Sequence, residues 1–136
     1  MTKDNITTAQ PKTRWFIDSD WYPQRSRSIS ALLQGCLCDG CRKKLNKEED
    51  QPPDAELINR IRECCHHSAE FITGRMPVME SAFRLFIASG NEPMTVEALG
   101  RQLSARHGGV TSHASEETLL RLLINDRYYG FCPVAD

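Results

Sequence analysis

The chain has 136 residues, of which 40% are hydrophobic and 26% charged, and its formal net charge is -1. This length supports one modest hydrophobic core or two small modules. No stretch approaches the run of about 18 apolar residues that a membrane span needs, and no apolar segment follows a basic start. We therefore expect a cytoplasmic protein without a membrane partner. In that reducing compartment, six cysteines predict metal ligands or buried thiols rather than disulfides.

The charge is unevenly distributed along the chain. Residues 1–47 hold nine Lys or Arg against four acidic residues, residues 48–76 hold three against seven, and residues 77–136 hold five against seven. The basic character thus lies close to the first cysteines. Phosphate binding requires locally clustered cations, so we expect any such activity in this part of the chain.

The first third of the chain predicts short elements that lead into the cysteines. Residues 1–12 are polar and without periodicity, which is typical of a disordered tail. "RWFIDSDWYP" is rich in aromatic residues and predicts a short strand or extended segment that stops at Pro23. "SRSISALLQG" predicts one short helix with Ser28 as its cap and Gly35 as a left-handed final residue.

The remainder is mainly helical in pattern. A linker at 46–54 precedes a helix that begins at the expected cap Asp54 and extends to about residue 67. Three further helices are predicted from apolar spacing and from the cap residues Thr95 and Ser115, followed by a β-type segment; their ranges are 77–90, 95–107, 115–127 and 128–134. We expect a mainly α fold with short β segments. It would divide into the tail 1–12, a zinc-stapled module at 13–75 and a second helical module at 76–136.

The segment "CDGC" has the C-x2-C spacing of a metal-binding knuckle. Cys38 and Cys41 can point two thiolates at one ion, and Gly40 would supply a positive φ in the turn between them. This pair predicts half of a tetrahedral zinc site.

The other half is expected from "CCHH" at residues 64–67. Cys64 and His67 lie three residues apart and would share a helix face. Cys64 and Cys65 are neighbours that diverge by about 100° on a helix, so both can bind one ion only where the helix ends or distorts. The predicted ligands are Cys38 and Cys41 with Cys65 and either Cys64 or His67, and Cys36 is a substitute.

Other uses of the same residues stay open. Cys36, Cys38 and Cys41 with Cys64 or Cys65 supply enough thiolates for an iron-sulfur cluster. Cys65 on an apolar helix face also suits simple burial, because a free cysteine behaves as a small hydrophobic residue. His67 also suits a solvated helix terminus.

From Met76 to Val134 the predicted order is helix, helix, glycine-bearing turn, third helix and a strand that opens with "DRYYGF". This order resembles winged-helix domains, in which the third helix enters the DNA major groove. The resemblance implies base contacts from residues 115–127. Glu116 and Glu117 would repel phosphates there, so we expect this module to dock a protein instead.

The amino-terminal basic region is the better candidate for binding nucleic acid. Its cations could pair with phosphates, and its interleaved aromatic residues could stack on bases. The predicted contacts are Arg14, Arg25, Arg27, Arg42, Lys43 and Lys44, accompanied by Trp15, Phe16, Trp21 and Tyr22. The same aromatic residues also suit a small core.

No nucleophile elbow, phosphate-binding glycine loop or HExxH motif occurs in the sequence, so we do not expect an enzyme. The pattern predicts a small zinc-binding protein that acts as an adaptor or transcription-associated regulator, with a protein partner and with nucleic acid as a second one. The alternative is a metal or redox sensor that uses an iron-sulfur cluster or a labile zinc. A site shared by two chains, as in a homodimer, is compatible with either.

Overall fold

The structure is a computed structural model that describes residues 12–106 and 115–134. The expected tail therefore lies outside the described residues, except for Lys12. The elements run in the order β1 (Arg14–Ile17), α1 (Trp21–Gln24), α2 (Ile29–Gly35), α3 (Asp39–Lys47), α4 (Asp54–Glu63), the 3-10 helix η2 (Cys65–His67), α5 (Val78–Ala88), β2 (Met94–Thr95), α6 (Val96–Arg106), α7 (Glu116–Ile124) and β3 (Phe131–Pro133). The described part is mainly helical with one small sheet, as the sequence predicts. None of its helices has the length and apolar character needed to cross a membrane.

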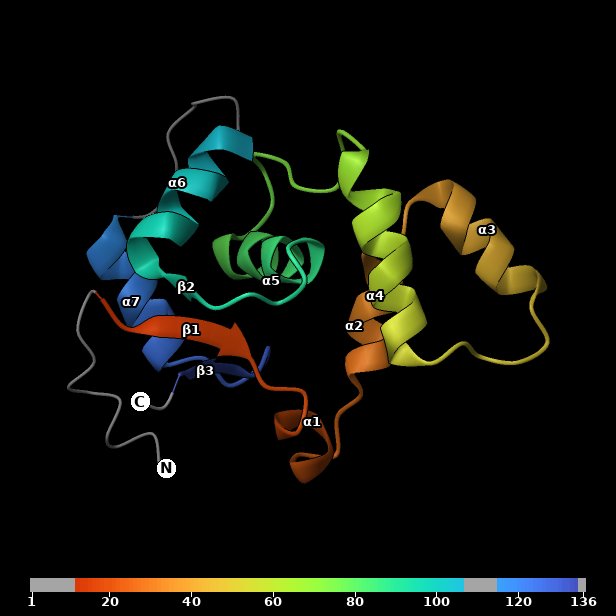
Figure 1. Ribbon diagram of the computed structural model, residues 1–136, viewed down its shortest axis with the longest axis horizontal. Coiled ribbons are helices and arrows are strands. Elements are labelled where there is room, and N and C mark those ends of the chain that lie inside the picture. Colours follow the sequence, from red (N-terminus) through yellow and green to blue (C-terminus); the bar gives the residue numbers. More distant parts are fainter. Residues whose placement is uncertain (1–11, 107–114, 135–136) are drawn as a thin grey trace.

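The sheet joins segments that are far apart in the sequence. Its three antiparallel strands have the order β2-β1-β3, with Trp15 opposite Met94 and Phe16 opposite Cys132. Trp15 and Ile17 are buried on one face of β1, in keeping with the two-residue period of a strand. The first strand of the chain is therefore the central strand of the sheet (Figure 1).

A winged-helix fold is not established for residues 76–134. Helix α5, strand β2, helices α6 and α7 and strand β3 do follow one another in the expected order. However, the strand that pairs with both β2 and β3 comes from residues 14–17. Among the described residues, no second strand follows β3 to complete a wing.

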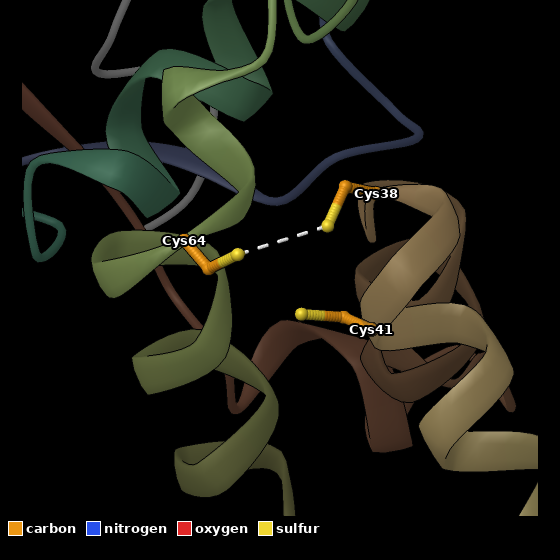
Figure 2. A group of neighbouring side chains, drawn as sticks. All are labelled: Cys38, Cys41 and Cys64. Atoms are coloured by element: carbon orange, nitrogen blue, oxygen red, sulfur yellow. Dashed lines mark hydrogen bonds between the residues drawn. The ribbon is translucent and has the colours of Figure 1, made fainter.

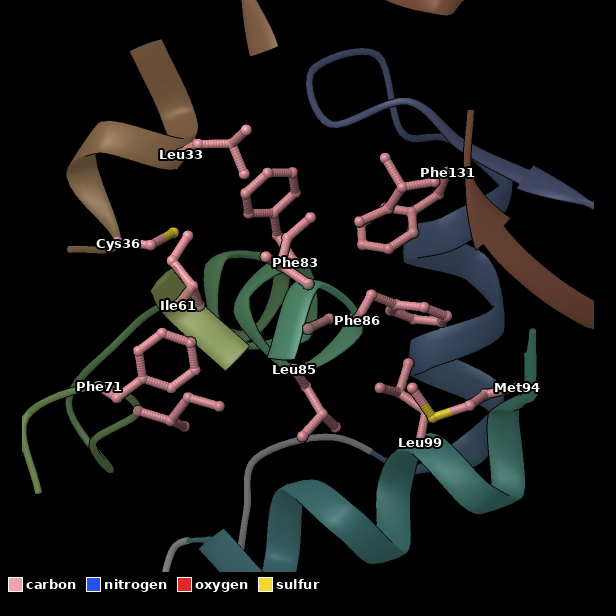
Figure 3. Packing of buried hydrophobic residues seen from close by; sticks show 14 of the residues in the cluster. Leu33, Cys36, Ile61, Phe71, Phe83, Leu85, Phe86, Met94, Leu99 and Phe131 are labelled. Atoms are coloured by element: carbon pink, nitrogen blue, oxygen red, sulfur yellow. The ribbon is translucent and has the colours of Figure 1, made fainter. Parts of the chain in front are cut away.

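Helix α5 forms the centre of the hydrophobic core. It buries Ala82, Phe83, Leu85, Phe86 and Ile87, whose spacing of three and four residues covers most of the helix circumference. Helices α4 and α6 pack against it, α2 packs on α4, and α7 packs on α6 (Figures 1 and 3). The cluster of buried side chains runs continuously from β1 to β3.

Helix α3 lies at the edge of the molecule, on the outer side of α4 (Figure 1). Cys41 is its only buried residue, and the helix carries Arg42, Lys43, Lys44 and Lys47 in exposed positions. Hydrophobic burial therefore contributes little to holding α3 in place.

Several of the predicted helix ends are confirmed. The N–H of Ala98 bonds to the hydroxyl of Thr95 at 3.2 Å, and that of Thr118 bonds to the hydroxyl of Ser115 at 3.2 Å. Gly90 follows α5 with φ 81°. These side chains and this glycine satisfy the backbone groups that a helix end leaves free.

Three predictions about helix ends are wrong. Asp54 is the first residue of α4 rather than its cap, which is Pro53. Gly35 ends α2, and Gly40 lies in the first turn of α3; both have helical backbones, and neither has a positive φ. Among the described residues, Ser26, Gly90, Asn91 and Gly130 have positive φ values instead.

Two polar side chains support the sheet. Asn91 accepts a hydrogen bond from the N–H of Ile17 at 2.9 Å and donates to its carbonyl at 2.8 Å. The buried carboxylate of Asp126 accepts from the N–H groups of Tyr128, Tyr129 and Phe131 at 3.0–3.1 Å. These bonds fix the ends of β1 and β3 without further strand pairing.

Candidate metal centre

The end of one helix and the start of another bring the cysteines together. Cys38 caps α3, and Cys41 lies one turn inside it. Helix α4 ends at Glu63, and Cys64 has the non-helical angles φ -128° and ψ -62° before Cys65 opens η2. The distortion needed for both members of the doublet to face one site is therefore present.

Three of the sulfurs form a compact group. The Sγ atoms of Cys38, Cys41 and Cys64 all lie within 4.8 Å of one another, and those of Cys38 and Cys64 are 3.8 Å apart (Figure 2). Four sulfurs arranged tetrahedrally at the usual Zn–S distance of about 2.3 Å are about 3.8 Å from one another. The group therefore has the dimensions of a metal-thiolate site.

Cys65 supplies a fourth sulfur beside this group. Its side chain is 1% exposed, and its Sγ accepts a hydrogen bond from the backbone N–H of Cys38 at 3.2 Å. The four cysteines form a cluster that could hold a metal ion, with one face toward solvent at Cys64 and one face buried at Cys65.

Without a metal, the thiols of the cluster differ in pKa. The nearby backbone N–H of Cys41 is the main reason that the pKa of Cys38 is lowered to about 7. Burial raises the pKa of Cys41 to about 11, and the hydrogen bond with Cys38 raises that of Cys64 to about 11. One thiolate thus forms near neutral pH, and a cation must displace the protons of the other thiols to gain all four as ligands.

Cys38 and Cys41 do not form a zinc knuckle, because they lie at the start of a regular helix. A cap position at the N-terminus of α3 places the Cys38 sulfur near free backbone N–H groups, which favour a thiolate. The exposed side chains of Arg42, Lys43 and Lys44 follow directly. They offset part of the double negative charge that four thiolates leave around a divalent ion.

Two other predicted ligands lie outside the cluster. The ring of His67 is exposed and lies 3.9 Å from the ring of His66, and His67 is not part of the three-sulfur group. The Cys36 thiol is buried in the core and donates to the carbonyl of Leu32 at 3.4 Å (Figure 3). This fold therefore does not bring Cys36 into the cysteine cluster.

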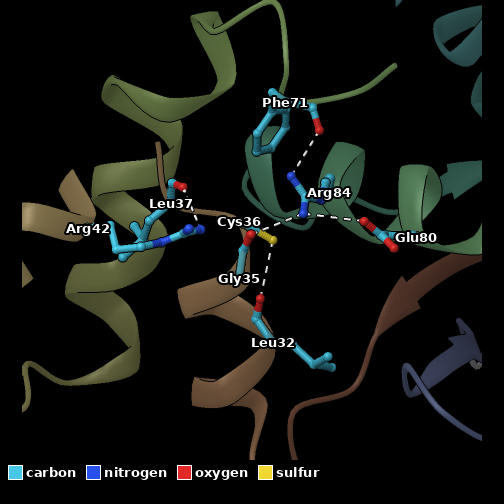
Figure 4. A network of polar contacts seen from close by, with 8 residues as sticks. All are labelled: Leu32, Gly35, Cys36, Leu37, Arg42, Phe71, Glu80 and Arg84. Atoms are coloured by element: carbon cyan, nitrogen blue, oxygen red, sulfur yellow. Dashed lines mark hydrogen bonds and ion pairs between the residues drawn. The ribbon is translucent and has the colours of Figure 1, made fainter. Parts of the chain in front are cut away.

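Arg84 on α5 fixes the segment that leads into the cluster, and the sequence reading did not identify it. It donates to the carbonyls of Gly35 at 3.0 Å and Phe71 at 3.1 Å, and it forms an ion pair with Glu80 at 3.3 Å (Figure 4). Arg42 likewise donates to the carbonyl of Leu37 at 3.2 Å. Both arginines line a cavity of about 640 Å³ next to Cys38 and Cys65, but their hydrogen bonds serve the backbone around the site.

The predicted nucleic-acid contacts are dispersed over the fold. All six basic side chains are exposed, but they lie on β1, after α1 and on α3, which are separate regions in Figure 1. Trp15, Trp21 and Tyr22 are buried in the core and are not available to stack on bases. The guanidinium of Arg25 lies 4.6 Å from the ring centre of Trp21, so this pair is a surface cation-π contact. The structure therefore leaves α3 as the most compact basic surface among the predicted residues.

No protein-family model, curated protein or solved structure matches the chain. The geometry of the cysteine cluster and the surface around it are therefore the features that bear on its function.

Proposed function

We propose that this protein binds one zinc ion through Cys38, Cys41, Cys64 and Cys65 and works in a reducing cytoplasm as a small binding protein. The observation that carries the proposal is the 3.8 Å separation of the Cys38 and Cys64 sulfurs within a group of neighbouring thiols, without a disulfide. Uncoordinated thiols gain little from such crowding, whereas a tetrahedral zinc-thiolate site requires it.

The proposed role of the metal is structural. Four sulfur ligands complete the coordination of zinc and leave no position open for a substrate. The ion would join the start of α3 to the end of α4. Since Cys41 is the only buried residue of α3, this joint replaces the hydrophobic contacts that the helix lacks. Structural zinc in small domains binds with apparent free energies of about 10–16 kcal/mol, which is comparable with the stability of a whole domain.

The proposed activity is that of an adaptor or transcription-associated regulator, with α3 as the contact surface. Arg42, Lys43, Lys44 and Lys47 are exposed on a helix of nine residues. A cationic helix held rigidly by a metal suits an acidic partner, either a protein surface or the phosphates of a nucleic acid. The four basic side chains support this assignment, and the position of α3 at the edge of the molecule gives a partner access to them.

The second candidate is a metal or redox sensor. It is favoured by the exposure of Cys64, which places one predicted ligand within reach of chelators and oxidants. An iron-sulfur cluster on the same four cysteines belongs to this alternative.

Cobalt substitution tests the ligand set. We expect the cobalt-loaded chain to show the intense thiolate charge-transfer bands and tetrahedral ligand-field bands of a four-sulfur site. Cys38→Ser and Cys65→Ser should weaken or shift these bands, and His67→Ala should leave them unchanged. Bands that are insensitive to Cys38→Ser would contradict the proposed site. Brown colour and sulfide in the chain as purified would favour the iron-sulfur alternative.

Charge reversal on α3 tests the proposed contact surface. We expect Lys43→Glu with Lys44→Glu to remove salt-dependent binding to single- and double-stranded nucleic acid or to an acidic polypeptide. The matched control is Arg25→Glu with Arg27→Glu, which changes as many charges near α1. Equal loss in both double variants would contradict a specific role for α3.

A further inference from the structure

The two outer sulfurs of the cluster differ from the two inner ones in their access to solvent. Cys64 is exposed and Cys38 is partly exposed, whereas Cys41 is 9% and Cys65 1% exposed. In the outer pair the two Sγ atoms lie 3.8 Å apart. Oxidants that arrive from solvent therefore reach a pair of sulfurs that are already close together.

We propose that Cys38 and Cys64 are a redox pair that exchanges the metal joint between α3 and α4 for a disulfide. This inference rests on the proposed zinc site and names its regulation. The co-reactant is a hydroperoxide, with hydrogen peroxide as the simplest member of the class. The direct product is a disulfide-linked chain that no longer holds the ion.

The chemistry requires two steps. In the zinc-loaded chain the ion would hold the exposed Cys64 as a thiolate, and this sulfur attacks the peroxide, so that an S–O bond forms, the O–O bond breaks and hydroxide leaves and takes up a proton from solvent. The Cys38 thiolate then attacks the sulfur of the Cys64 sulfenic acid, so that the S–S bond forms and the S–O bond breaks, and the hydroxide that leaves takes up a second proton from solvent to give water. The two sulfurs lose two electrons, which the peroxide gains. Only Cys41 and Cys65 are then left as thiol ligands, which is too few for a closed zinc site.

The position of α3 allows the required approach. A disulfide needs the sulfurs at about 2.05 Å, so the pair must close by less than 2 Å from its separation of 3.8 Å. Helix α3 buries only Cys41, and Cys64 lies in a non-helical junction. Cys64 is exposed and Cys38 only partly buried, so neither side chain of the pair is enclosed in the core. The new bond would still join α3 to α4 after the ion has left, whereas a reduced chain without metal would lose both joints.

The arrangement also predicts selectivity among the six cysteines. Cys36 lies in the core with its thiol bonded to Leu32, and Cys132 lies on β3 at the other side of the fold. Cys41 and Cys65 are shielded by their burial. One equivalent of oxidant should therefore yield mainly the Cys38–Cys64 bond.

The test treats the full zinc-loaded chain with one equivalent of hydrogen peroxide. Zinc release is followed with a chromogenic chelator, and free and oxidised thiols are labelled differently before fragmentation mass spectrometry. We expect one zinc released per disulfide formed, a Cys38–Cys64 linkage, and recovery of zinc binding after reduction. Cys64→Ser removes a proposed ligand together with the exposed sulfur, so its readout is thiol oxidation and not zinc release: its remaining thiols should oxidise roughly tenfold more slowly. Cys132→Ser is the control. It has the same number of thiols as Cys64→Ser and should behave as the unaltered chain.

Two results would overturn the proposal. A first disulfide between Cys38 and Cys41, between Cys64 and Cys65, or involving Cys36 would show that proximity and exposure do not select the pair. Thiol oxidation at equal rates in the Cys64→Ser variant and the unaltered chain would show that Cys64 does not initiate the reaction. A chain that binds no zinc would overturn the proposed function instead. The disulfide map of that chain, oxidised without metal, would still decide whether Cys38 and Cys64 pair.

Discussion

The backbone N–H of Cys38 donates to the sulfur of Cys65 at 3.2 Å, across a sequence separation of 27 residues. This bond joins Cys38, the residue that caps α3, to Cys65, the buried member of the Cys64–Cys65 doublet. Cys65 therefore has two roles, as a packed side chain and as a proposed ligand, whereas the exposed Cys64 has only the second.

Serine substitutions should separate these two roles. In the presence of reductant and chelator, Cys65→Ser should lower the free energy of unfolding by about 1–2 kcal/mol, because a buried hydroxyl replaces a packed thiol. Cys64→Ser should leave the stability of the metal-free chain unchanged, since its side chain is exposed. Urea denaturation of both variants checks this. Equal stability of the two metal-free variants would contradict the assigned burial.

Alanine at two glycines should have opposite effects on stability. Gly40→Ala should raise the free energy of unfolding by about 0.5–1 kcal/mol, because Gly40 is helical and a Cβ there meets nothing within 4 Å. Gly130→Ala should lower it by about 1–3 kcal/mol. Gly130 has φ 77°, and its Cβ would lie 3.1 Å from the Tyr22 ring and 3.2 Å from the Asp18 carbonyl. Thermal unfolding of both variants measures the effects. Loss of stability or of metal in Gly40→Ala would favour a knuckle turn at Cys38–Cys41 over the observed helix.

The partly buried side chain of Asn91 should contribute strongly to the free energy of unfolding. Asn91→Ala removes both hydrogen bonds to Ile17 and leaves a non-glycine residue at φ 61°, so we expect a loss of about 2–3 kcal/mol. Asn91→Gly removes the same bonds without the backbone strain and should lose less. Chemical denaturation of the two variants gives the difference. A glycine variant less stable than the alanine variant would contradict the assigned conformation.

Cys36 should make the free energy of unfolding of the zinc-loaded chain fall as the pH becomes alkaline. Burial raises the pKa of its thiol from 9.0 to about 11. A raised pKa means that the folded chain favours the protonated thiol. Its contribution, about 3 kcal/mol at most, is therefore complete below pH 9 and is lost as the pH rises from 9 to 11.

The free energy of unfolding measured between pH 8 and 10 tests this effect in Cys36→Ala and in the unaltered chain. At pH 8 the free energy of unfolding of Cys36→Ala should be lower than that of the unaltered chain, because a core side chain is truncated. It should then fall less steeply as the pH rises. The window stops at pH 10 because burial also raises the pKa of Tyr22, whose contribution is lost at higher pH. Parallel pH profiles would contradict the buried state of the Cys36 thiol.

The helices after residue 53 could be predicted from the sequence because their apolar residues recur every three or four positions. Val96, Leu99 and Leu103 are buried as expected, and Thr95 and Ser115 bond to the helix starts. Helix α3 could not be found in this way. Its one buried residue, Cys41, gives no periodic pattern, and its remaining side chains are mostly charged.

The sequence could indicate which cysteines and histidines were candidate ligands, but not which of these candidates the fold brings together. Spacing indicates the Cys38–Cys41 pair and the 64–67 cluster, but the choice of Cys64 and Cys65 over His67 depends on where α4 ends. That end is a tertiary effect. The central place of β1 in the sheet and the contacts of Arg84 and Asn91 are non-local for the same reason, since their partners lie 13 to 118 residues away.

Metal content of the full chain, purified without added metal or chelator, tests the central claim most directly. Elemental analysis should give one zinc per chain for the unaltered protein and for Cys132→Ser. It should give much less for Cys38→Ser and Cys65→Ser, whose thermal transition should move to a lower temperature because the stabilisation by the metal is lost. Half a zinc per chain would point to a site shared by two chains. An unaltered chain that contains no metal, and that gains neither zinc nor thermal stability when zinc is added, would contradict the account.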